Sequence, residues 1–196
     1  MNNLYKVLLF IILLGITCFF LFSCSSDSVP KPRGYYRIGF PEKDYRQLSN
    51  DFPYTFSYPV YASIEPDKSR LAEKYWVNVY FPSYKARIHI SYKEAQGRLD
   101  SLVEDTYKLT YKHAGKADAI SQTVYSDSEN RVYGLLYQVK GNAASSYQFY
   151  VTDSVKHFLR GALYFSVTPN KDSLAPAVDF FGEDVIKLME TVRWKN

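Results

Sequence analysis

The feature that most constrains this chain is a short apolar run near its start that ends at a cysteine. Val7 to Phe22 is a charge-free stretch of 16 residues, preceded by Lys6 and followed by Ser23 and Cys24. A basic start, an apolar middle and a small residue at the end are typical of a secretory signal peptide. We therefore expect residues 1–23 to be removed on export, so that the folded protein begins at Cys24.

Cys24 carries the second inference about this segment. The sequence Leu21-Phe22-Ser23-Cys24 looks like a bacterial lipobox, in which the cysteine thiol is alkylated by diacylglycerol before the leader is cleaved. Phe22 is bulkier than the residue usual at its position. The alternative is an uncleaved signal anchor, but a transmembrane helix needs about 20 apolar residues, and no basic cluster directly follows the run. Either outcome tethers the chain to a membrane outside the cytoplasm.

Length and composition constrain the part of the chain beyond the leader. Residues 24–196 amount to 173, with 23 basic and 20 acidic side chains and a net charge of +3, which fits one domain. So small an excess does not indicate nucleic acid as a partner. Both cysteines, Cys18 and Cys24, fall in the leader and anchor, so no disulfide or thiolate ligand is expected in the domain. Its stability must come from packing, for which 18 of the 19 tyrosines are available.

The pattern along the chain predicts a tether and one domain. Residues 24–34 are predicted to be a lipidated N-terminus and an extended, proline-containing tether, and residues 35–196 a single domain. Helical spacing of apolar residues predicts two helices, at 98–113 and 178–194, the second separated from the last strand by a loop at 169–176. Period-two alternation or dense aromatic and β-branched residues predict strands at 54–58, 75–81, 86–92, 119–126, 131–140, 145–152 and 158–168.

The order of these elements predicts an α+β fold with a single antiparallel β-sheet flanked by helices. Short, turn-rich connections between 119 and 168 indicate an antiparallel meander. The strand at 75–81, apolar on both faces apart from Asn78, is expected at the centre of the sheet. Gly115 is expected to cap the first helix. The arrangement resembles that of PsbP/Mog1-like domains, a likeness of fold that does not fix function.

A search for catalytic motifs finds none of the familiar ones. The sequence contains no G-x-S-x-G, H-E-x-x-H, Walker loop or G-x-G-x-x-G. His89, His113 and His157 are far apart and show no metal-ligand spacing, so neither a metal nor another cofactor is expected. Adjacent acidic residues on a helix diverge by about 100° and are interpreted as solvated surface. The expectation is a protein that is not an enzyme.

Two segments suggest binding instead. The first is PKPRGYYRIGFP, residues 30–41, in which guanidinium groups are able to stack on aromatic rings or hold a carboxylate or phosphate. The simpler interpretation is a strand at the start of the domain whose aromatic side chains pack on the sheet. The residues concerned are Arg33, Tyr35, Tyr36, Arg37 and Phe40.

The second segment is KHAGKADAI, residues 112–120, at the end of the first predicted helix. Its candidates for partner binding are His113, Lys116 and Asp118. The competing interpretation is electrostatic, because cations are favourable at the negative end of a helix dipole.

These two segments also carry a family resemblance. A lipobox followed by PKPRGYYRIGFPEKDY, with KHAGKADAI farther along, resembles the gliding-motility lipoprotein GldD family of Bacteroidota, over the range from Lys31 to Trp194. The resemblance implies a cell-envelope lipoprotein needed for gliding and for the associated type IX protein secretion machinery. It implies no catalytic residue, and Cys24 is the one functional position that it transfers, as the site of lipidation.

Three functions are compatible with these observations. The favoured one is a non-enzymatic accessory or assembly factor, anchored by its lipid to the inner or outer membrane, facing the periplasm, and contacting other gliding and secretion proteins of the envelope. The second is a PsbP-like ligand-binding or carrier domain that holds a small molecule or peptide between helix and sheet. A deep, tyrosine-lined pocket would favour it and a filled core would count against it. The third is an envelope enzyme, which requires distant groups such as His113 and Asp118 to converge with a serine.

Overall fold

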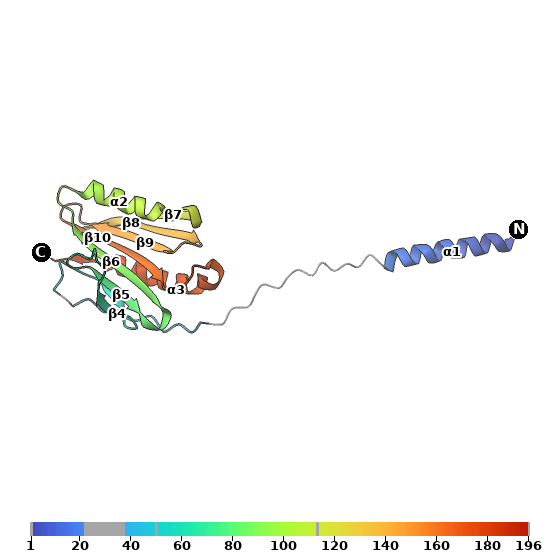
Figure 1. Ribbon diagram of the computed structural model, residues 1–196, viewed down its shortest axis with the longest axis horizontal. Helices are drawn as coiled ribbons and strands as arrows, with labels where there is room; N and C mark the ends of the chain where they lie inside the picture. The colour runs from blue at the N-terminus through green and yellow to red at the C-terminus, as the bar shows by residue number, and fades with distance from the viewer. Residues whose placement is uncertain (1, 22–37, 50, 113, 196) are drawn as a thin grey trace. The chain divides into compact units, whose positions relative to one another are not determined.

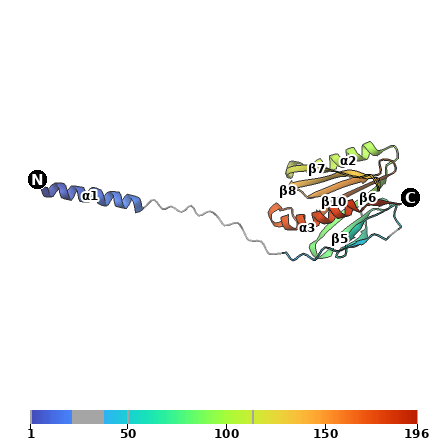
Figure 2. The same cartoon turned by 180° about the vertical axis from the view of Figure 1, so that it is seen from behind.

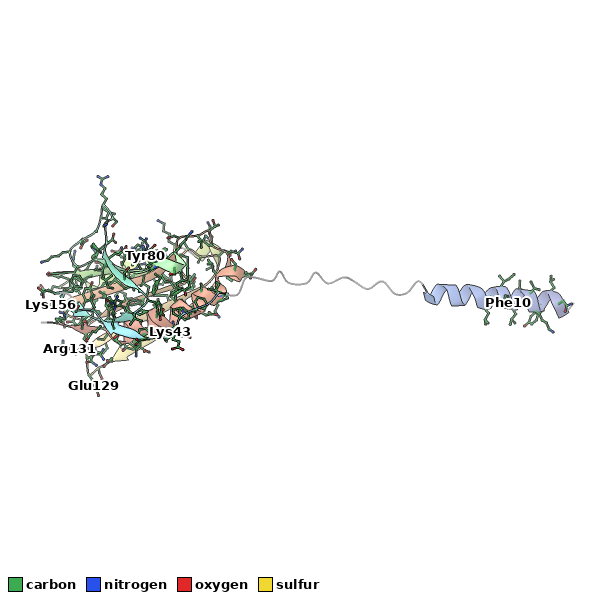
Figure 3. All side chains as sticks on the ribbon, turned by 90° about the horizontal axis from the view of Figure 1, so that it is seen from below. Phe10, Lys43, Tyr80, Glu129, Arg131 and Lys156 are labelled. Atoms are coloured by element: carbon green, nitrogen blue, oxygen red, sulfur yellow. The ribbon has the colours of Figure 1, made fainter. Side chains whose placement is uncertain are left out.

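The computed structural model describes residues 2–21, 38–49, 51–112 and 114–195. The chain divides into two compact units, residues 1–36 and 37–196. The first contains helix α1 (Asn2–Leu21), whose large apolar side chains between Leu4 and Leu13 are exposed, Phe10 among them (Figure 3). Within the described ranges, no helix is both long and apolar enough to cross a membrane. Cys24 lies outside the described residues.

The second unit is built on a seven-stranded antiparallel sheet with the strand order β4-β5-β6-β10-β9-β8-β7. Strands β7 to β10 form the predicted meander, and β4 to β6 form a second one (Figure 1). The β6–β10 pair joins the two meanders. The expected α+β fold with an antiparallel sheet is thereby confirmed. The strands are β4 (Ser63–Pro66), β5 (Val77–Phe81), β6 (Ala86–Glu94), β7 (Ala117–Asp127), β8 (Val132–Gly141), β9 (Tyr147–Thr152) and β10 (His157–Phe165).

Two short pairings accompany the main sheet. β1 (Tyr45–Gln47) pairs with β3 (Ser57–Pro59), and β2 (Tyr54–Thr55) pairs with β11 (Arg193–Trp194). The sequence pattern predicts none of β1, β4 and β11, because strands of two to four residues are too short to show alternation. The strand expected at the centre of the sheet, β5, is second from one edge, and β10 occupies the middle.

Helices cover the two faces of this sheet (Figures 1 and 2). On one face, α2 (Leu99–Tyr111) packs Leu102 against Tyr137, Tyr150 and Phe158. On the other face, α3 (Lys171–Glu190) closes the main core, which the 3-10 turn η1 (Pro82–Tyr84) borders between β5 and β6. Because β9 is covered on both sides, all six of its residues are buried.

The boundaries of the helices differ from the sequence prediction in three places. The helix expected at 178–194 ends at Glu190, and Arg193 and Trp194 form β11 instead. The prediction of a loop at 169–176 is wrong from residue 171 onward, where α3 begins. Asn170 caps the start of this helix by accepting a hydrogen bond from the Ser173 amide at 3.1 Å. Pro176, which favours a loop by its sequence, lies inside the helix. Gly115 does not cap α2: the cap is Lys112, and Gly115 lies in the 3-10 turn η2 (Ala114–Lys116).

A buried carboxylate fastens α3 to the start of the domain. The Asp184 side chain is 0% exposed and lies 2.7 Å from Lys43 Nζ. It also accepts hydrogen bonds from the hydroxyls of Tyr45, at 2.8 Å, and Tyr61, at 2.7 Å. Burial, and then the bond to Asp184, raise the pKa of both phenols well above the ordinary value. Lys43 is held in addition by the Phe180 carbonyl at 2.6 Å and lies over the Phe180 ring.

Removing this carboxylate is expected to destabilise the domain strongly. In Asp184→Ala, Lys43 and two tyrosine hydroxyls lose their common acceptor, and the free energy of unfolding in urea should fall by about 3 kcal/mol. The matched control is Glu183→Gln, because Glu183 lies 3.8 Å from the same ammonium but its side chain is 69% exposed; its effect should stay within about 0.5 kcal/mol. Equal losses in the two variants would contradict a structural role for the buried pair.

Candidate functional site

A groove of about 440 Å³ lies between α2 and the face of the sheet that α3 does not cover. Its floor comes from β6 and β10, where Ser91 is paired with Arg160 and His89 with Ala162. Because paired and alternate residues of a sheet share a face, these side chains point to the same side. Its apolar wall is formed by Trp76, Leu102, Leu109 and Phe158.

Arg160 is the cation at the floor of this groove. Its Nη2 donates a hydrogen bond to Gln148 Oε1 at 2.7 Å, while its buried Nε has no hydrogen-bond partner among the described residues. Burial lowers the pKa of the guanidinium and the neighbouring Tyr164 acts in the opposite direction, but an arginine keeps its charge in proteins. Arg160 is therefore a half-buried positive charge with unused hydrogen-bonding capacity.

His89 lies beside this cation and is uncharged at neutral pH. Its pKa is lowered chiefly by burial and further by the positive charges of Arg87 and Arg160, against the opposing effect of Asp67. The imidazole meets the Tyr164 ring edge-on, with 5.4 Å between the centroids. A neutral imidazole both donates and accepts hydrogen bonds, so His89 adds a polar group without a charge to the floor.

Two carboxylates, Asp67 and Asp105, also border the groove, as do Ser69 and Lys93. Lys93 is engaged by a salt bridge to Glu73, and Asp67 accepts the Ser69 amide at 2.7 Å. The described residues include no group of three side chains placed to hold a metal ion. The groove thus combines an unpaired guanidinium, a neutral imidazole and an apolar wall with two carboxylates and a paired lysine at its border, a combination suited to binding a small ligand.

Most residues of the first predicted binding segment, and one of the second, lie outside the described residues: Arg33, Tyr35, Tyr36, Arg37 and His113. Phe40 is described, and it is half-buried with its ring stacked on Phe180 at 4.3 Å and on Tyr84 at 5.7 Å. These contacts are those of a packing residue. A partner-binding role for the segment stays a prediction.

The second predicted segment lies at the start of β7. Lys116 and Asp118 are exposed, and the Asp118 carboxylate lies 2.7 Å from Lys171 Nζ at the beginning of α3. Gly141 of β8 lets the backbone of β7 come close at this point: a Cβ atom there would lie 2.7 Å from the Asp118 amide nitrogen, and its φ is +109°. Lys116 and Asp118 thus belong to a different region from the groove, and their binding role is likewise a prediction.

Sequence reasoning missed the groove itself. Alternation along β6 places Arg87, His89 and Ser91 on one face, and this much is readable from the sequence. Their neighbour Arg160 is separated from them in chain order by α2 and three strands, and only the β6–β10 pairing brings it alongside. The available signal was a cation in the middle of the otherwise apolar strand His157–Phe165.

The fold assigns the protein to the PsbP-like α+β class. The structure is similar to the solution structure of cyanobacterial PsbP (CyanoP) from Synechocystis sp. PCC 6803, with a TM-score of 0.51 and 11% sequence identity over 82% of this chain and 98% of that chain. At this identity the likeness concerns fold alone. A search of curated proteins found no match to the chain.

The family is shown by a second comparison. The model of the gliding motility lipoprotein GldD family matches residues 25–194, and the chain belongs to that family. The resemblance carried by the lipobox and the two motifs is thereby confirmed. Membership implies a lipoprotein of the cell envelope with a role in gliding motility.

The electrostatics of the groove predict a specific response of His89. Arg87→Gln removes the larger of the two repulsive charges, so the pKa of His89 should rise, as followed by an NMR titration of the imidazole. His157 is the internal control, because its pKa is lowered by burial and modified by Asp153, Lys156 and Glu94, without Arg87. A shift of both histidines, or of neither, would contradict the arrangement described.

Proposed function

We propose that this protein is a lipid-anchored accessory or assembly factor of the cell envelope, acting through protein contacts rather than catalysis in gliding motility and the associated type IX secretion machinery. The observation that carries the proposal is the family match over residues 25–194. In this proposal residues 1–23 are the cleaved signal peptide, 24–34 the lipidated tether, and 35–196 the domain. The domain faces the periplasm from the inner or outer membrane.

The anchor follows from the chemistry of Cys24. A single acyl chain gives only marginal, reversible membrane binding, and stable anchoring takes two signals. A processed lipoprotein cysteine carries three chains, which exceeds this requirement. The short tether then keeps the domain close to the membrane, so its partners are other proteins of the gliding and secretion apparatus.

Contacts of the two described histidines, His89 and His157, support a non-enzymatic role. His157 Nδ1 is hydrogen-bonded to the Tyr92 hydroxyl at 2.8 Å, and its ring stacks on Trp194 with centroids 5.1 Å apart. It is a buried structural residue. His89 lies on a sheet face, where burial and then the charges of Arg87 and Arg160 lower its pKa, against the effect of Asp67. Neither contact set resembles a base held against a nucleophile, as covalent catalysis needs.

A second candidate function, the PsbP-like ligand-binding or carrier domain, is favoured by the groove. A site between helix and sheet is what this alternative requires, and the volume of about 440 Å³ suits a small molecule. The expected lining by tyrosines does not support the ligand-binding alternative, because Tyr137, Tyr147 and Tyr150 are buried packing residues. The interior of the main core is filled by side chains such as Phe149 and Phe181, both 0% exposed.

The anchor is tested by Cys24→Ala. Without the thiol no lipid is attached, so the protein should move from the membrane to the soluble fraction and a deletion strain should not regain gliding. Immunoblots of fractionated cells and colony spreading measure the two effects. Cys18→Ala is the matched control, because it removes the other cysteine of the chain and should change neither. Full gliding with a soluble Cys24→Ala protein would refute the role of the tether.

Partner binding by the first segment is tested by co-purification. The double variant Arg33→Ala/Arg37→Ala should lose envelope partners that the tagged wild-type protein retains after cross-linking, because guanidinium groups supply its charged contacts. The control is Arg70→Ala/Arg131→Ala, which removes two exposed arginines elsewhere. Equal recovery of partners by both double variants would show that the segment is not the contact surface.

A further inference from the structure

The groove contains a charge that the fold does not neutralise. Throughout the described part of the chain, no carboxylate lies within salt-bridge distance of Arg160 or Arg87. The Nε atoms of both arginines are buried and have no hydrogen-bond partner. A charge removed from water without a counter-charge is costly, and an unsatisfied buried donor adds to that cost. Such an arrangement is stabilised when an anion binds.

The neighbours of Arg160 restrict where the anion lies. Gln148 already occupies the outer Nη2 with its carbonyl oxygen, which also accepts from Thr110 Oγ1 at 3.3 Å. Arg87 lies over the Tyr80 ring, with 5.2 Å between its Cζ and the ring centroid. Since Nε is buried and Nη2 is bonded to Gln148, the edge of Arg160 that is left for a ligand is the terminal one, at Nη1. A guanidinium edge presents parallel donors that match the two oxygens of a carboxylate.

The border of the groove restricts the rest of the ligand. Asp67 and Asp105 disfavour a dianion such as phosphate, because two like charges face it across the groove. The only other cation of the lining, Lys93, is paired with Glu73 within the described residues. Leu102, Leu109 and Phe158 present an apolar surface beside the guanidinium. A monoanion with an apolar body fits these conditions better than a free inorganic ion.

We propose that this groove binds a small organic carboxylate, whose carboxylate group accepts hydrogen bonds from Arg160 and whose apolar body lies against α2. His89 and Ser91, on the same face of β6, are placed to contact the carboxylate as neutral hydrogen-bonding groups. The proposal deepens the second candidate function and rests on it. It is independent of the lipid anchor and of the contacts made by residues 30–41.

The test compares four probes on the full lipidated protein in nanodiscs, followed by saturation-transfer NMR titration with empty nanodiscs subtracted. The probes are 3-phenylpropionate, its neutral counterpart 3-phenylpropanol, the cation 3-phenylpropylamine and inorganic phosphate. We expect 3-phenylpropionate to bind at least about tenfold more tightly than the alcohol, since hydrogen bonds to a charged group are worth more than neutral ones. The amine and phosphate should bind more weakly still.

Two variants locate the effect. Arg160→Gln should abolish the preference for the carboxylate over the alcohol, whereas Arg131→Gln should keep it. Arg131 is a suitable control because it lies exposed at the turn between β7 and β8, next to Glu129 (Figure 3). Leu109→Ser tests the apolar wall without disturbing the core, since this side chain is 47% exposed. It should weaken 3-phenylpropionate about threefold.

Each contrary outcome has a distinct meaning. Equal binding of the acid and the alcohol would overturn the carboxylate proposal while leaving a ligand-binding groove in place. Phosphate binding as tightly as 3-phenylpropionate would overturn it in favour of an inorganic anion. If no probe binds the wild-type protein, and if wild type and Arg160→Gln unfold at the same temperature, both the ligand-binding function and the carboxylate proposal are overturned.

Discussion

The pairing of β6 with β10 is the interaction on which the rest of the domain depends. It runs in register from Ala86 opposite Phe165 to Glu94 opposite His157. Each strand belongs to a different meander, so this one ladder joins the two halves of the sheet. Gly161 leaves space for the Phe149 ring of the adjacent strand β9, because a Cβ atom there would lie 2.1 Å from that ring. Without this pairing neither the main core nor the floor of the groove would exist.

The two helices use this platform differently. The long helix α3 inserts Phe181, Val185 and Leu188, each 0% exposed, so the core beneath these residues is filled by side chains. A chain that has no cysteine after Cys24 relies on such packing, and Asp184 adds a bonded anchor point for the start of the domain. The shorter α2 covers only part of the opposite face. The uncovered part of β6 and β10 is where the polar and charged side chains gather.

Local pattern explains why some of this was predictable and some was not. The alternation around Ile88 and Ile90 predicts β6, and the spacing of Leu99 to Thr110 predicts α2, because both depend on neighbours in sequence. Pro176 misleads because a proline favours a loop, whereas the start of α3 is decided by Asn170 and the core contacts beyond it. The groove was not predictable, because Arg160 meets Ser91 only through a long-range pairing. The family was recognisable from its motifs, which can be read directly from the sequence without the fold.

The last strand has a consequence for how the domain matures. β11 pairs Arg193 and Trp194 with β2, and the Trp194 indole donates to the Arg131 carbonyl at 3.0 Å. β2 and β11 lie far apart in sequence, so their pairing closes a long loop of chain. We therefore expect this pairing to form late in folding, after the local contacts of the two meanders.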